Sequence, residues 1–512
     1  MKTGTFFQYN ITEGQGGATF FPDKTGVYRR GKPMADNPTL DPKTAKILPW
    51  VVAVAFFMQM LDGTILNTAL PTMAKDLHTN PLQMQSVVIA YMLTVALIIP
   101  ASGWLADKFG IKRIFLFAIA LFTLGSLACG LSPTLDIIVA CRVVQGIGGA
   151  LMVPVGRLVV LRAYPREQLV TVLSFITIPG LIGPLIGPTL GGFLVEYASW
   201  HWIFFINIPV GIIGILSTLK YMPQLTRGGD LFPFDKIGFI LFSTFMLTLT
   251  LGLEGIGELH LAYAPMVLLM VFGLVCLVGY VLYSRYTSRP LFSPDLFKIR
   301  NFSVGILGNL FARLGNGAMP FLTPLLLQIG LGYSPMKAGL SMIPMTVGAL
   351  ISKSAATRLV NRFGYRLILT VNTLLLGLMI GLFSTIDKTM NYWLMMAIFT
   401  VFGIINSLQF TAMNTVTLVD LSDRQASSGN SLLSVIMQLS MSMGVAIAAA
   451  ILSEFTGVAS LTAARDVIAA FAKTFLCLGF LAAISTVIFI HIKPDSGKVP
   501  PKNKQPPVPA DH

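Results

Sequence analysis

The sequence predicts an all-α polytopic membrane protein with about fourteen transmembrane helices. Hydrophobic residues make up 54% of the chain, charged residues only 11%, and the mean hydropathy is +0.74, far from the averages of soluble proteins. Apolar segments long enough to cross a bilayer follow one another along the chain. The net charge of +14 comes from basic residues in alternate short loops, which indicates membrane topology rather than nucleic-acid binding.

A window of roughly 20 residues places the predicted spans in order. They lie at roughly 48–70, 85–105, 114–132, 137–160, 169–195, 202–222, 236–254, 263–283, 303–329, 338–357, 367–386, 391–418, 429–453 and 467–491. With both chain ends inside, about 25 Lys and Arg residues fall on the inner side and about five on the outer side. We therefore expect a bacterial inner (cytoplasmic) membrane protein, surrounded by lipid, with both termini in the cytoplasm.

An internal repeat divides the chain. LADKFGIKR from Leu105 matches LVNRFGYRL from Leu359, 254 residues later, with Phe-Gly in register, and the same spacing places Asp62 over Asn316. The order of matches predicts two six-helix halves related by duplication, with two central helices inserted between them. The expected parts are a disordered cytoplasmic tail (1–46), a first six-helix half (47–222), a central insertion with a cytoplasmic linker (223–302), a second six-helix half (303–492) and a cytoplasmic tail (493–512).

The N-terminal residues lack the short apolar core and cleavage site of a signal peptide, so the first span is expected to be an uncleaved anchor. Met34 directly precedes a short polar lead into that span, and we expect it to be the native start. The four cysteines, Cys129, Cys141, Cys276 and Cys477, all lie within apolar spans, and no disulfide framework is implied.

Asp62 in MQMLDGTILNTALP is the sharpest clue to function, because a charge inside a span is costly unless it is paired or hydrated. By the helical rise, Asp62 lies roughly 12 Å from the outer end of the first span, and Arg142 lies roughly 8 Å from the outer end of the fourth. Their similar depths favour a contact in which Asp62 binds and releases protons. The alternatives are a fixed structural ion pair for Asp62 and an arginine that reaches outer water for Arg142.

Other polar residues inside the spans are candidates for a substrate cavity, namely Asn67 in the first half and Arg313 and Asn316 in the second. Asn316 takes the place of Asp62 in the repeat but cannot titrate, so proton handling is expected mainly in the first half. Arg313, Arg157 and Lys353 can instead extend along their helices to the membrane surface, and the sequence leaves both interpretations open.

The segment GLIGPLIGPTLGG places glycine and proline in the middle of an uncharged span. Its glycines recur at three- and four-residue spacing and form a smooth stripe that suits close helix packing. Two prolines on an adjacent face are expected to bend the helix. We expect this to be the fifth helix of the first half, packed at the interface between the halves. The residues are Gly180, Gly183, Gly187 and Gly191 in the stripe, with Pro184 and Pro188 beside it.

Together, four motifs resemble those of the major facilitator superfamily. GWLADKFGIKR resembles the loop signature between its second and third helices, CRVVQGIGGA around Arg142 its fourth-helix signature, and the Gly/Pro segment its antiporter signature. LDGTILNTALP around Asp62 resembles the first-helix signature of the fourteen-helix drug:proton antiporters of the EmrB/QacA type. The run through SWHWIFFINIPVGIIG is similar to the MdtD-like exporters of that family. The resemblance covers the chain after residue 46.

The resemblance implies a major facilitator fold and proton coupling by Asp62 and Arg142. Two residues depart from the family pattern: Gly63 stands where Thr or Ser is usual, and Asn361 stands where the first half has Asp107. Conformational roles are implied for the motif residues Gly103, Asp107, Gly110, Lys112, Arg113, Gly146, Gly180, Gly183, Pro184, Gly187, Pro188 and Gly191.

The expected function is the efflux of amphipathic small molecules in exchange for protons, by alternating access, in a monomer without a cofactor or a nucleic-acid partner. A dedicated exporter of one metabolite or lipid-like compound shares every motif, and a membrane receptor on this scaffold is the less favoured alternative. The five histidines are scattered, and the sequence contains no metal-ligand spacing, nucleophile elbow or phosphate loop. We therefore expect no enzyme activity and no metal site.

Overall fold

The computed structural model describes residues 20–22, 28–30, 41–224, 233–258, 263–456 and 464–494. A short antiparallel pair, β1 (Phe20–Pro22) with β2 (Tyr28–Arg30), precedes the helices. This pair and the start of α1 at Pro42 replace parts of the disordered tail expected over 1–46. Met34 and the C-terminal tail beyond residue 494 lie outside the described residues.

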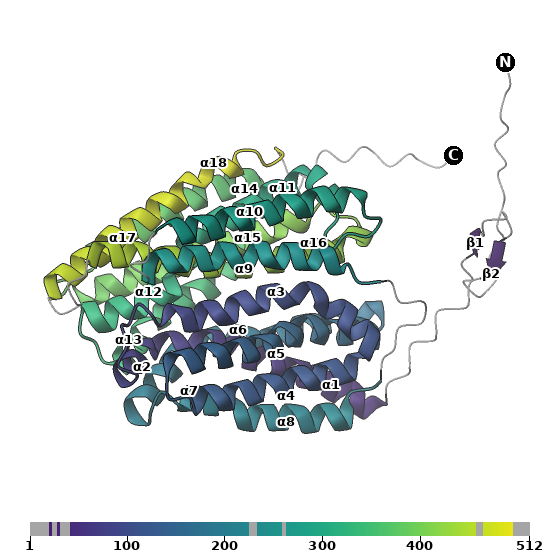
Figure 1. The fold of residues 1–512 in the computed structure, drawn as a ribbon, viewed down its shortest axis with the longest axis horizontal. Coiled ribbons are helices and arrows are strands. Elements are labelled where there is room, and N and C mark those ends of the chain that lie inside the picture. Colours follow the sequence, from purple (N-terminus) through teal and green to yellow (C-terminus); the bar gives the residue numbers. More distant parts are fainter. Residues whose placement is uncertain are drawn as a thin grey trace, which may run out of the picture.

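The first group of helices lies in the lower part of Figure 1. Its long helices run back and forth along one direction, as antiparallel spans of a membrane bundle do. The elements are α1 (Pro42–Ile65), η1 (Leu66–Thr68), α2 (Leu70–Asp76), α3 (Gln85–Phe109), α4 (Ile111–Gly130), α5 (Leu135–Ala163), α6 (Arg166–Tyr197), α7 (Trp202–Phe205) and α8 (Asn207–Tyr221).

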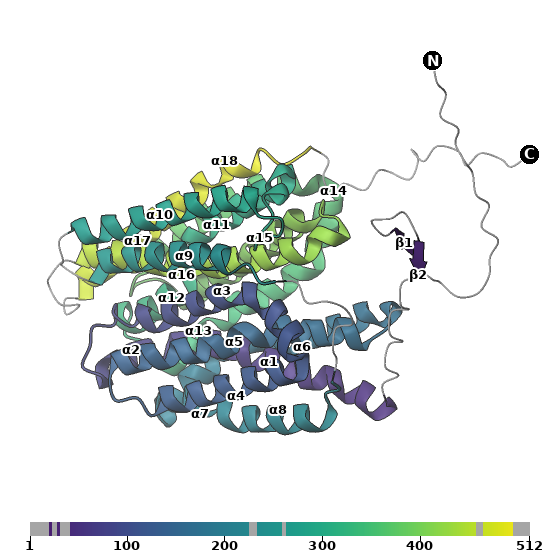
Figure 2. The ribbon, with the colours of Figure 1, turned by 45° about the vertical axis from the view of Figure 1, so that its right-hand side comes forward.

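The second group lies above it, and Figure 2 shows the two groups side by side from another direction. Between the groups, α3 packs along α16, α6 packs along α13 and α14, and α9 contacts both α16 and α3. The elements are α9 (Lys236–Glu258), α10 (Tyr263–Tyr286), η2 (Pro294–Lys298), α11 (Arg300–Asn316), α12 (Met319–Leu325), η3 (Leu326–Gly330), α13 (Pro335–Ser341), α14 (Ile343–Leu382), η4 (Phe383–Thr385), α15 (Tyr392–Leu418), α16 (Asp423–Thr456), α17 (Ala464–Ile484) and α18 (Thr486–Phe489).

Twelve helices in the described part are long and apolar enough to cross a membrane, against the fourteen spans expected. The other two expected spans are interrupted. The span 303–329 is divided among α11, which has only 17 residues, α12 and the π-helix η3. The span 338–357 is divided between α13 and the first part of α14. Hydropathy alone joined these pieces because the breaks after Asn316 and after Ser341 fall inside largely apolar sequence.

The internal repeat has a structural counterpart at two glycines. Gly110 separates α3 from α4 with φ of 91°, and Gly364 interrupts α14 with φ of 78°. Positive φ is costly for residues with a Cβ atom, so both tight reversals depend on glycine. The matched Phe-Gly pairs therefore mark the same turn in each half.

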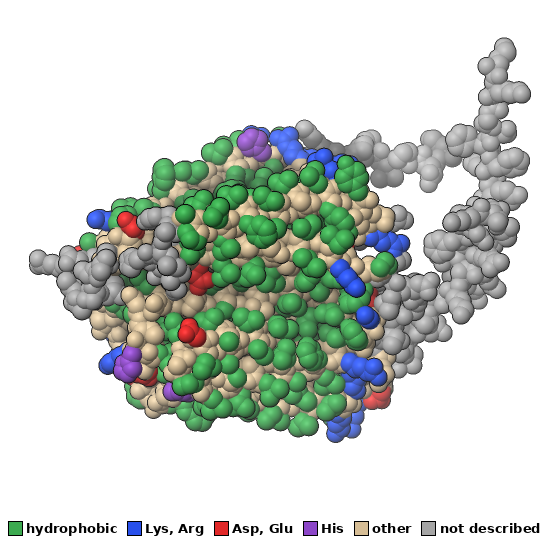
Figure 3. Space-filling view, in the orientation of Figure 1, with side chains coloured by type: hydrophobic (Ala, Val, Ile, Leu, Met, Phe, Trp, Pro, Cys, Tyr) green, Lys and Arg blue, Asp and Glu red, His purple; other side chains and the backbone are tan. Residues whose placement is uncertain are grey.

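The surface is that of a protein surrounded by lipid. Hydrophobic side chains cover the sides of the helix bundle, and Lys and Arg side chains gather at its right-hand end in Figure 3. Among the exposed apolar residues are Leu268 and Val275 of α10 and Phe480 of α17. Exposed apolar surface of this extent is stable only in contact with hydrocarbon.

The glycines of α5 permit close packing inside the first group. A Cβ atom at Gly148 would lie 2.5 Å from the backbone nitrogen of Phe122 on α4, and one at Gly125 on α4 would lie 2.8 Å from the backbone of Gln145. Neither helix backbone can move away without disturbing its other contacts. Small residues at such crossings are the usual device for packing membrane helices.

We expect Gly148→Leu to destabilise the protein by about 1–3 kcal/mol or more, because it overpacks a backbone contact. The measurement is the unfolding transition of purified protein in a denaturing-detergent titration. Gly381→Leu is the control, since the atom nearest to a Cβ there is a leucine methyl group at 4.0 Å. Equal stability of the two variants would contradict the close α4–α5 contact.

Candidate functional site

A buried ion pair lies at the centre of the first group. Asp62 lies on α1 one turn before this helix tightens into η1, and Arg142 lies on α5. Arg142 Nη1 donates to Asp62 Oδ2 at 2.6 Å, and both side chains are at most 2% exposed. The structure thus brings together the two residues expected to lie at similar depth.

Three further residues complete a hydrogen-bond network around the pair. Gln145 Nε2 donates to Asp62 Oδ1 and to Ser126 Oγ, both at 2.8 Å, and Gln145 Oε1 accepts from Arg142 Nη1 at 2.7 Å. Asn207 Nδ2 donates to Asp62 Oδ1 at 3.1 Å and to Ser126 Oγ at 2.9 Å. The carboxylate therefore accepts hydrogen bonds from side chains of α5 and α8. The amides of Gln145 and Asn207 also share Ser126 Oγ of α4 as an acceptor.

Helix α3 closes the network on another side. The guanidinium centre of Arg142 lies 4.2 Å from the centre of the Tyr91 ring, and its Nε donates to the Val87 carbonyl at 3.3 Å. Glycines on α5 make this approach possible, because a Cβ at Gly146 would lie 2.8 Å from Thr94 and one at Gly149 would lie 2.6 Å from the Tyr91 hydroxyl. The glycines of α5 thus allow the aromatic face of Tyr91 to lie against the buried guanidinium of Arg142.

This arrangement can respond to a proton. A buried ion pair is stable only while both charges are present, and removing one costs about 3–5 kcal/mol in measured cases. Protonation of Asp62 removes the negative charge and turns one carboxylate oxygen from an acceptor into a donor. Arg142, Gln145 and Asn207 all donate to this carboxylate, so protonation weakens contacts from two helices at once.

The sequence analysis did not identify Gln145, Asn207, Ser126 or Tyr91. Gln145 follows Arg142 by three residues and shares its helix face, which was an available signal. Asn207 begins α8 as a buried polar residue within an apolar run. Ser126 and Tyr91 carried no comparable signal, because only the packing of α3 and α4 against α5 brings them to the pair.

The loop motif lies at the opposite end of α3. Asp107 pairs with Arg162 of α5, and Lys112 Nζ donates to the Leu219 carbonyl of α8 at 2.8 Å. Arg113 is exposed. A Cβ at Gly103 would meet no atom within 4 Å, so the packing in this conformation does not require glycine there.

The glycine stripe of α6 does not face the second group as expected. At Gly183, Gly187 and Gly191 atoms of α1 or η1 lie where a Cβ would stand, including Leu61 N at 2.8 Å from Gly183 and the Ile65 carbonyl oxygen beside Gly191, and at Gly180 the nearest atoms are side-chain atoms of α1 at 3.8 and 3.9 Å. The stripe therefore packs against the helix that carries Asp62. Contacts with the second group come instead from the C-terminal part of α6, where Pro188 and Gly192 lie against the backbone of α13. The helix runs unbroken through Pro184 and Pro188.

Arg313 is a buried cation of the second group. It lies on the last turn of α11 and is 5% exposed. Its Nε donates to Asn309 Oδ1 at 3.1 Å, its Nη2 donates to Asn414 Oδ1 at 3.4 Å, and the Phe410 ring centre is 4.7 Å from the guanidinium. Three residues on, Asn316 donates from Nδ2 to Asn406 Oδ1 at 2.5 Å. The facing sides of α11 and α15 are thus polar at mid-span.

Two further candidates lie near the ion pair. Asn67 is buried on η1 and donates to the Gly63 carbonyl at a long 3.5 Å. Gly63 lies beside Asp62, and a Cβ there would meet no atom within 4 Å. Asn67 makes no hydrogen bond to Asp62, Arg313 or Asn316 among those found in the described part. The assignment of Asn67, Arg313 and Asn316 to a substrate cavity therefore stays a prediction.

Arg157 of α5 is exposed, and its guanidinium centre lies 6.0 Å from the Phe56 ring centre of α1. Within the described residues, no group of three or more His, Cys, Asp or Glu side chains could hold a metal ion. The four cysteines are free thiols.

A family model described as Major Facilitator Superfamily matches residues 52–444 and 305–512 of this chain. The chain is 50% identical over 450 residues to the "Putative multidrug resistance protein MdtD" of Serratia proteamaculans, covering 87% of this chain and 93% of that protein. It is 49% identical to the protein of that name in Pectobacterium atrosepticum (88% and 96% covered) and 50% identical to that of Escherichia coli O157:H7 (87% and 94% covered).

Solved structures share the fold. A POT family transporter in complex with 5-aminolevulinic acid superposes with a TM-score of 0.64 at 14% identity, covering 86% of this chain and 95% of that one. A mutant of the nucleoside transporter NupG gives a TM-score of 0.62 at 13% identity, covering 87% and 99%. At this level of identity the similarity establishes the architecture and leaves the substrate open.

Proposed function

This chain belongs to the major facilitator superfamily, and from that membership we propose that it is a proton-coupled efflux transporter that exports amphipathic small molecules. The observation that carries the proposal is the buried Asp62–Arg142 pair with its amide partners. A titratable carboxylate inside a span is a functional group by default. The protein is a multi-pass membrane transporter of a small molecule and not an enzyme, and the relatives compared above are named "Putative multidrug resistance protein MdtD".

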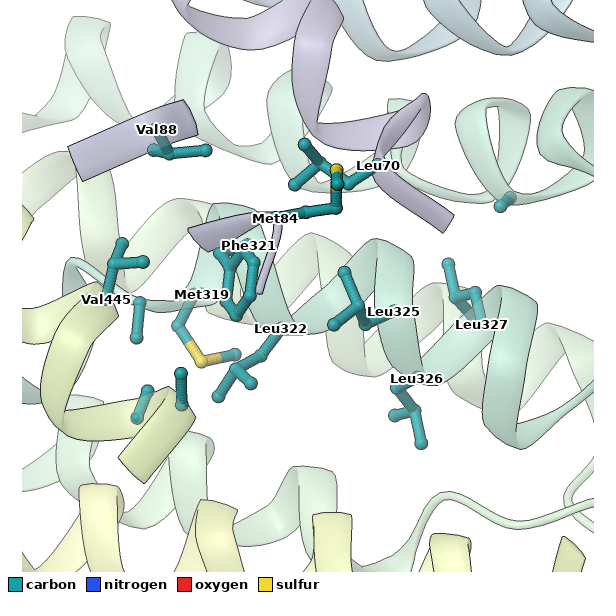
Figure 4. Packing of buried hydrophobic residues seen from close by; sticks show 14 of the residues in the cluster. Leu70, Met84, Val88, Met319, Phe321, Leu322, Leu325, Leu326, Leu327 and Val445 are labelled. Carbon is teal, nitrogen blue, oxygen red and sulfur yellow. The ribbon is translucent and has the colours of Figure 1, made fainter. Parts of the chain in front are cut away.

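Contacts between the two groups support alternating access. At one end of the bundle, Gln328 Nε2 of η3 donates to the Thr68 carbonyl at 2.9 Å, and Thr189 Oγ1 of α6 donates to the Gly339 carbonyl of α13 at 3.4 Å. In the same region, Leu70, Met84 and Val88 of the first group pack near Met319 and Phe321 of the second (Figure 4). The two groups are therefore closed against each other at the end away from the Asp107 motif.

We assign the closed end to the outside, because the Lys- and Arg-rich end belongs to the cytoplasm under the positive-inside rule. The conformation then faces inward. Both termini lie in the cytoplasm, the membrane is the bacterial inner membrane, and the transporter acts as a monomer with one transport pathway between its halves.

The proposed cycle couples the proton to this closure. In the outward-facing state Asp62 takes up a proton from outside, and its contacts with Arg142 and the two amides weaken. Because the α6 stripe packs directly on α1, a shift of α1 at Asp62 is transmitted to α6, whose outer end touches α13. Release of the proton to the inside restores the ion pair seen here.

The proton gradient is strong enough for this task. One charge moving across 100 mV releases about 2.3 kcal/mol, and one pH unit adds about 1.4 kcal/mol. Together these sustain a substrate gradient of more than about a hundredfold per proton for a neutral substrate.

The test is efflux into inverted membrane vesicles against a chemically diverse panel, with and without a proton ionophore. We expect uptake of at least one amphipathic compound that collapses when the ionophore is added. Vesicles without the protein are the control. Binding without any ionophore-sensitive flux across the panel would contradict transport and favour a receptor.

A further inference from the structure

Two arginines are buried in the described part of the spans, and they differ in how their charge is balanced. Arg142 is neutralised by Asp62 at 2.6 Å. Arg313 has no such partner, because within the described part of the chain no carboxylate lies within ion-pair distance of it. Its recorded contacts are two amide oxygens and one aromatic ring.

The position of Arg313 makes this imbalance significant. Counting from Arg300, it lies about 20 Å into the membrane along α11, where an unpaired charge is costly. The C-terminal end of α11 supplies a partial negative charge, and Phe410 supplies a π face. Both compensate a cation only in part.

Hydrogen-bonding capacity is also left over at this position. Of the five N–H groups of a guanidinium, one on Nε and one on Nη2 donate to the oxygens of Asn309 and Asn414. One turn away, Asn316 Oδ1 is buried without a hydrogen-bond partner. A cation with spare donors, one turn from an acceptor without a partner, indicates a polar site that a ligand can complete.

The surroundings indicate the shape of that ligand. Phe410 is 45% exposed although it covers a buried cation, and the side chains of Asn316, Asn406 and Asn414 are half-buried. The facing sides of α11 and α15 therefore offer an apolar surface, the Phe410 ring, beside a cation and several amides. An amphipathic molecule with an acidic head group matches both features.

From these observations we propose that Arg313 and Asn414 bind the acidic group of the exported molecule while Phe410 packs against its apolar part, so that the substrate class is amphipathic organic anions. This deepens the proposed function, on which it rests. Arg157 adds a second cation without a carboxylate neighbour among the described residues, about 9 Å from the inner end of α5. It favours the entry of anions from the cytoplasmic side.

The test uses three naphthalene probes of similar shape and fixed charge, namely naphthalene-2-sulfonate, naphthalene-2-sulfonamide and (2-naphthylmethyl)trimethylammonium. Their binding to the purified full-length protein in nanodiscs is measured by fluorescence without any ion gradient. We expect the sulfonate to bind at least about tenfold more tightly than the sulfonamide, as a charge-assisted contact with arginine implies. The cation is expected to bind most weakly.

Two variants of different kinds test the role of Arg313. Arg313→Gln removes the cation, and Asn414→Asp places a carboxylate against it with almost no change of shape. Both are expected to reduce the sulfonate-to-sulfonamide ratio to about one, while Arg313→Lys retains part of the preference. Arg366→Gln, which removes an exposed cation of the same half, is expected to leave the ratio unchanged.

A wild-type ratio near one, or a ratio unaffected by Arg313→Gln and by Asn414→Asp, would overturn the proposal. Its failure can be told apart from failure of the transport proposal. Arg313-dependent anion binding without ionophore-sensitive flux would support the anion site and contradict proton-coupled export. Ionophore-sensitive flux without an anion preference would support proton-coupled export and contradict the anion site.

Discussion

Replacing Asp62 by Asn is expected to abolish proton-driven export while the protein remains in the membrane. The amide keeps the size of the carboxylate but cannot gain or lose a proton in the physiological range. Export against a gradient should therefore fall from more than about a hundredfold accumulation, which the proton gradient can sustain, to simple equilibration. The measurement is ionophore-sensitive uptake of an identified substrate into inverted vesicles.

Loss of activity could also arise from damage to the fold, because Asp62→Asn leaves Arg142 buried without its counter-charge. The double variant Asp62→Asn with Arg142→Gln separates the two effects. It removes both charges, so we expect its unfolding transition to recover toward that of the wild type while its proton-driven export stays absent. Recovery of export along with stability would show that the pair is structural.

Asp136→Asn is the matched control. This acid lies in the first turn of α5, on the same helix as Arg142, but is exposed. We expect normal export from it, since an exposed acid at a helix end is hydrated and has no buried partner. A defect equal to that of Asp62→Asn would indicate that loss of an acid anywhere near this end disturbs transport.

The sequence predicts the ion pair but not the network around it. Asp62 and Arg142 could be paired because each is a charge inside an apolar span, and helical rise places them at similar depth. Asn207 and Ser126 are uncharged polar residues, which occur in many membrane spans without a functional role. Their role depends on which faces α4 and α8 turn toward α1, and a single sequence does not contain that information.

The α6 stripe shows the same limit. Its spacing correctly indicates a smooth helix face, but smoothness does not specify the neighbour. The structure places α1 against this face, and only the C-terminal part of α6 reaches α13. In contrast, Gly110 and Gly364 were matched by sequence alone and share positive φ, because a tight reversal leaves a local requirement for glycine that repeats with the fold.

The contact between α6 and α13 leads to the second large effect. At Gly339 of α13 a Cβ would collide with the carbonyl oxygen of Pro188, and at Gly192 of α6 it would collide with that of Pro335. Both obstacles are backbone atoms, which cannot rotate away as a side chain can. Closure of the outer end therefore requires glycine at these two positions.

We expect Gly339→Leu to prevent this closure and to hold the transporter open to the outside. Overpacking a rigid contact costs about 1–3 kcal/mol, which shifts a two-state population by roughly 5- to 150-fold. Export should fall at least about fivefold, because the inward-facing state that loads the substrate is depleted. Inverted vesicles give the rate, and expression in the membrane shows that the protein is inserted.

A labelling experiment separates a locked transporter from a damaged one. The four native cysteines are first replaced by alanine, and a single cysteine is introduced at Met319. Met319 is 2% exposed between the two groups of helices, so labelling of this cysteine reports whether the outer end is open. We expect a membrane-impermeant maleimide added from outside to label it faster in Gly339→Leu. Gly279→Leu is the control, because the nearest atom to a Cβ there is a leucine methyl group at 3.9 Å on α9. Unchanged labelling together with unchanged export would show that α6 and α13 do not form the outer closure.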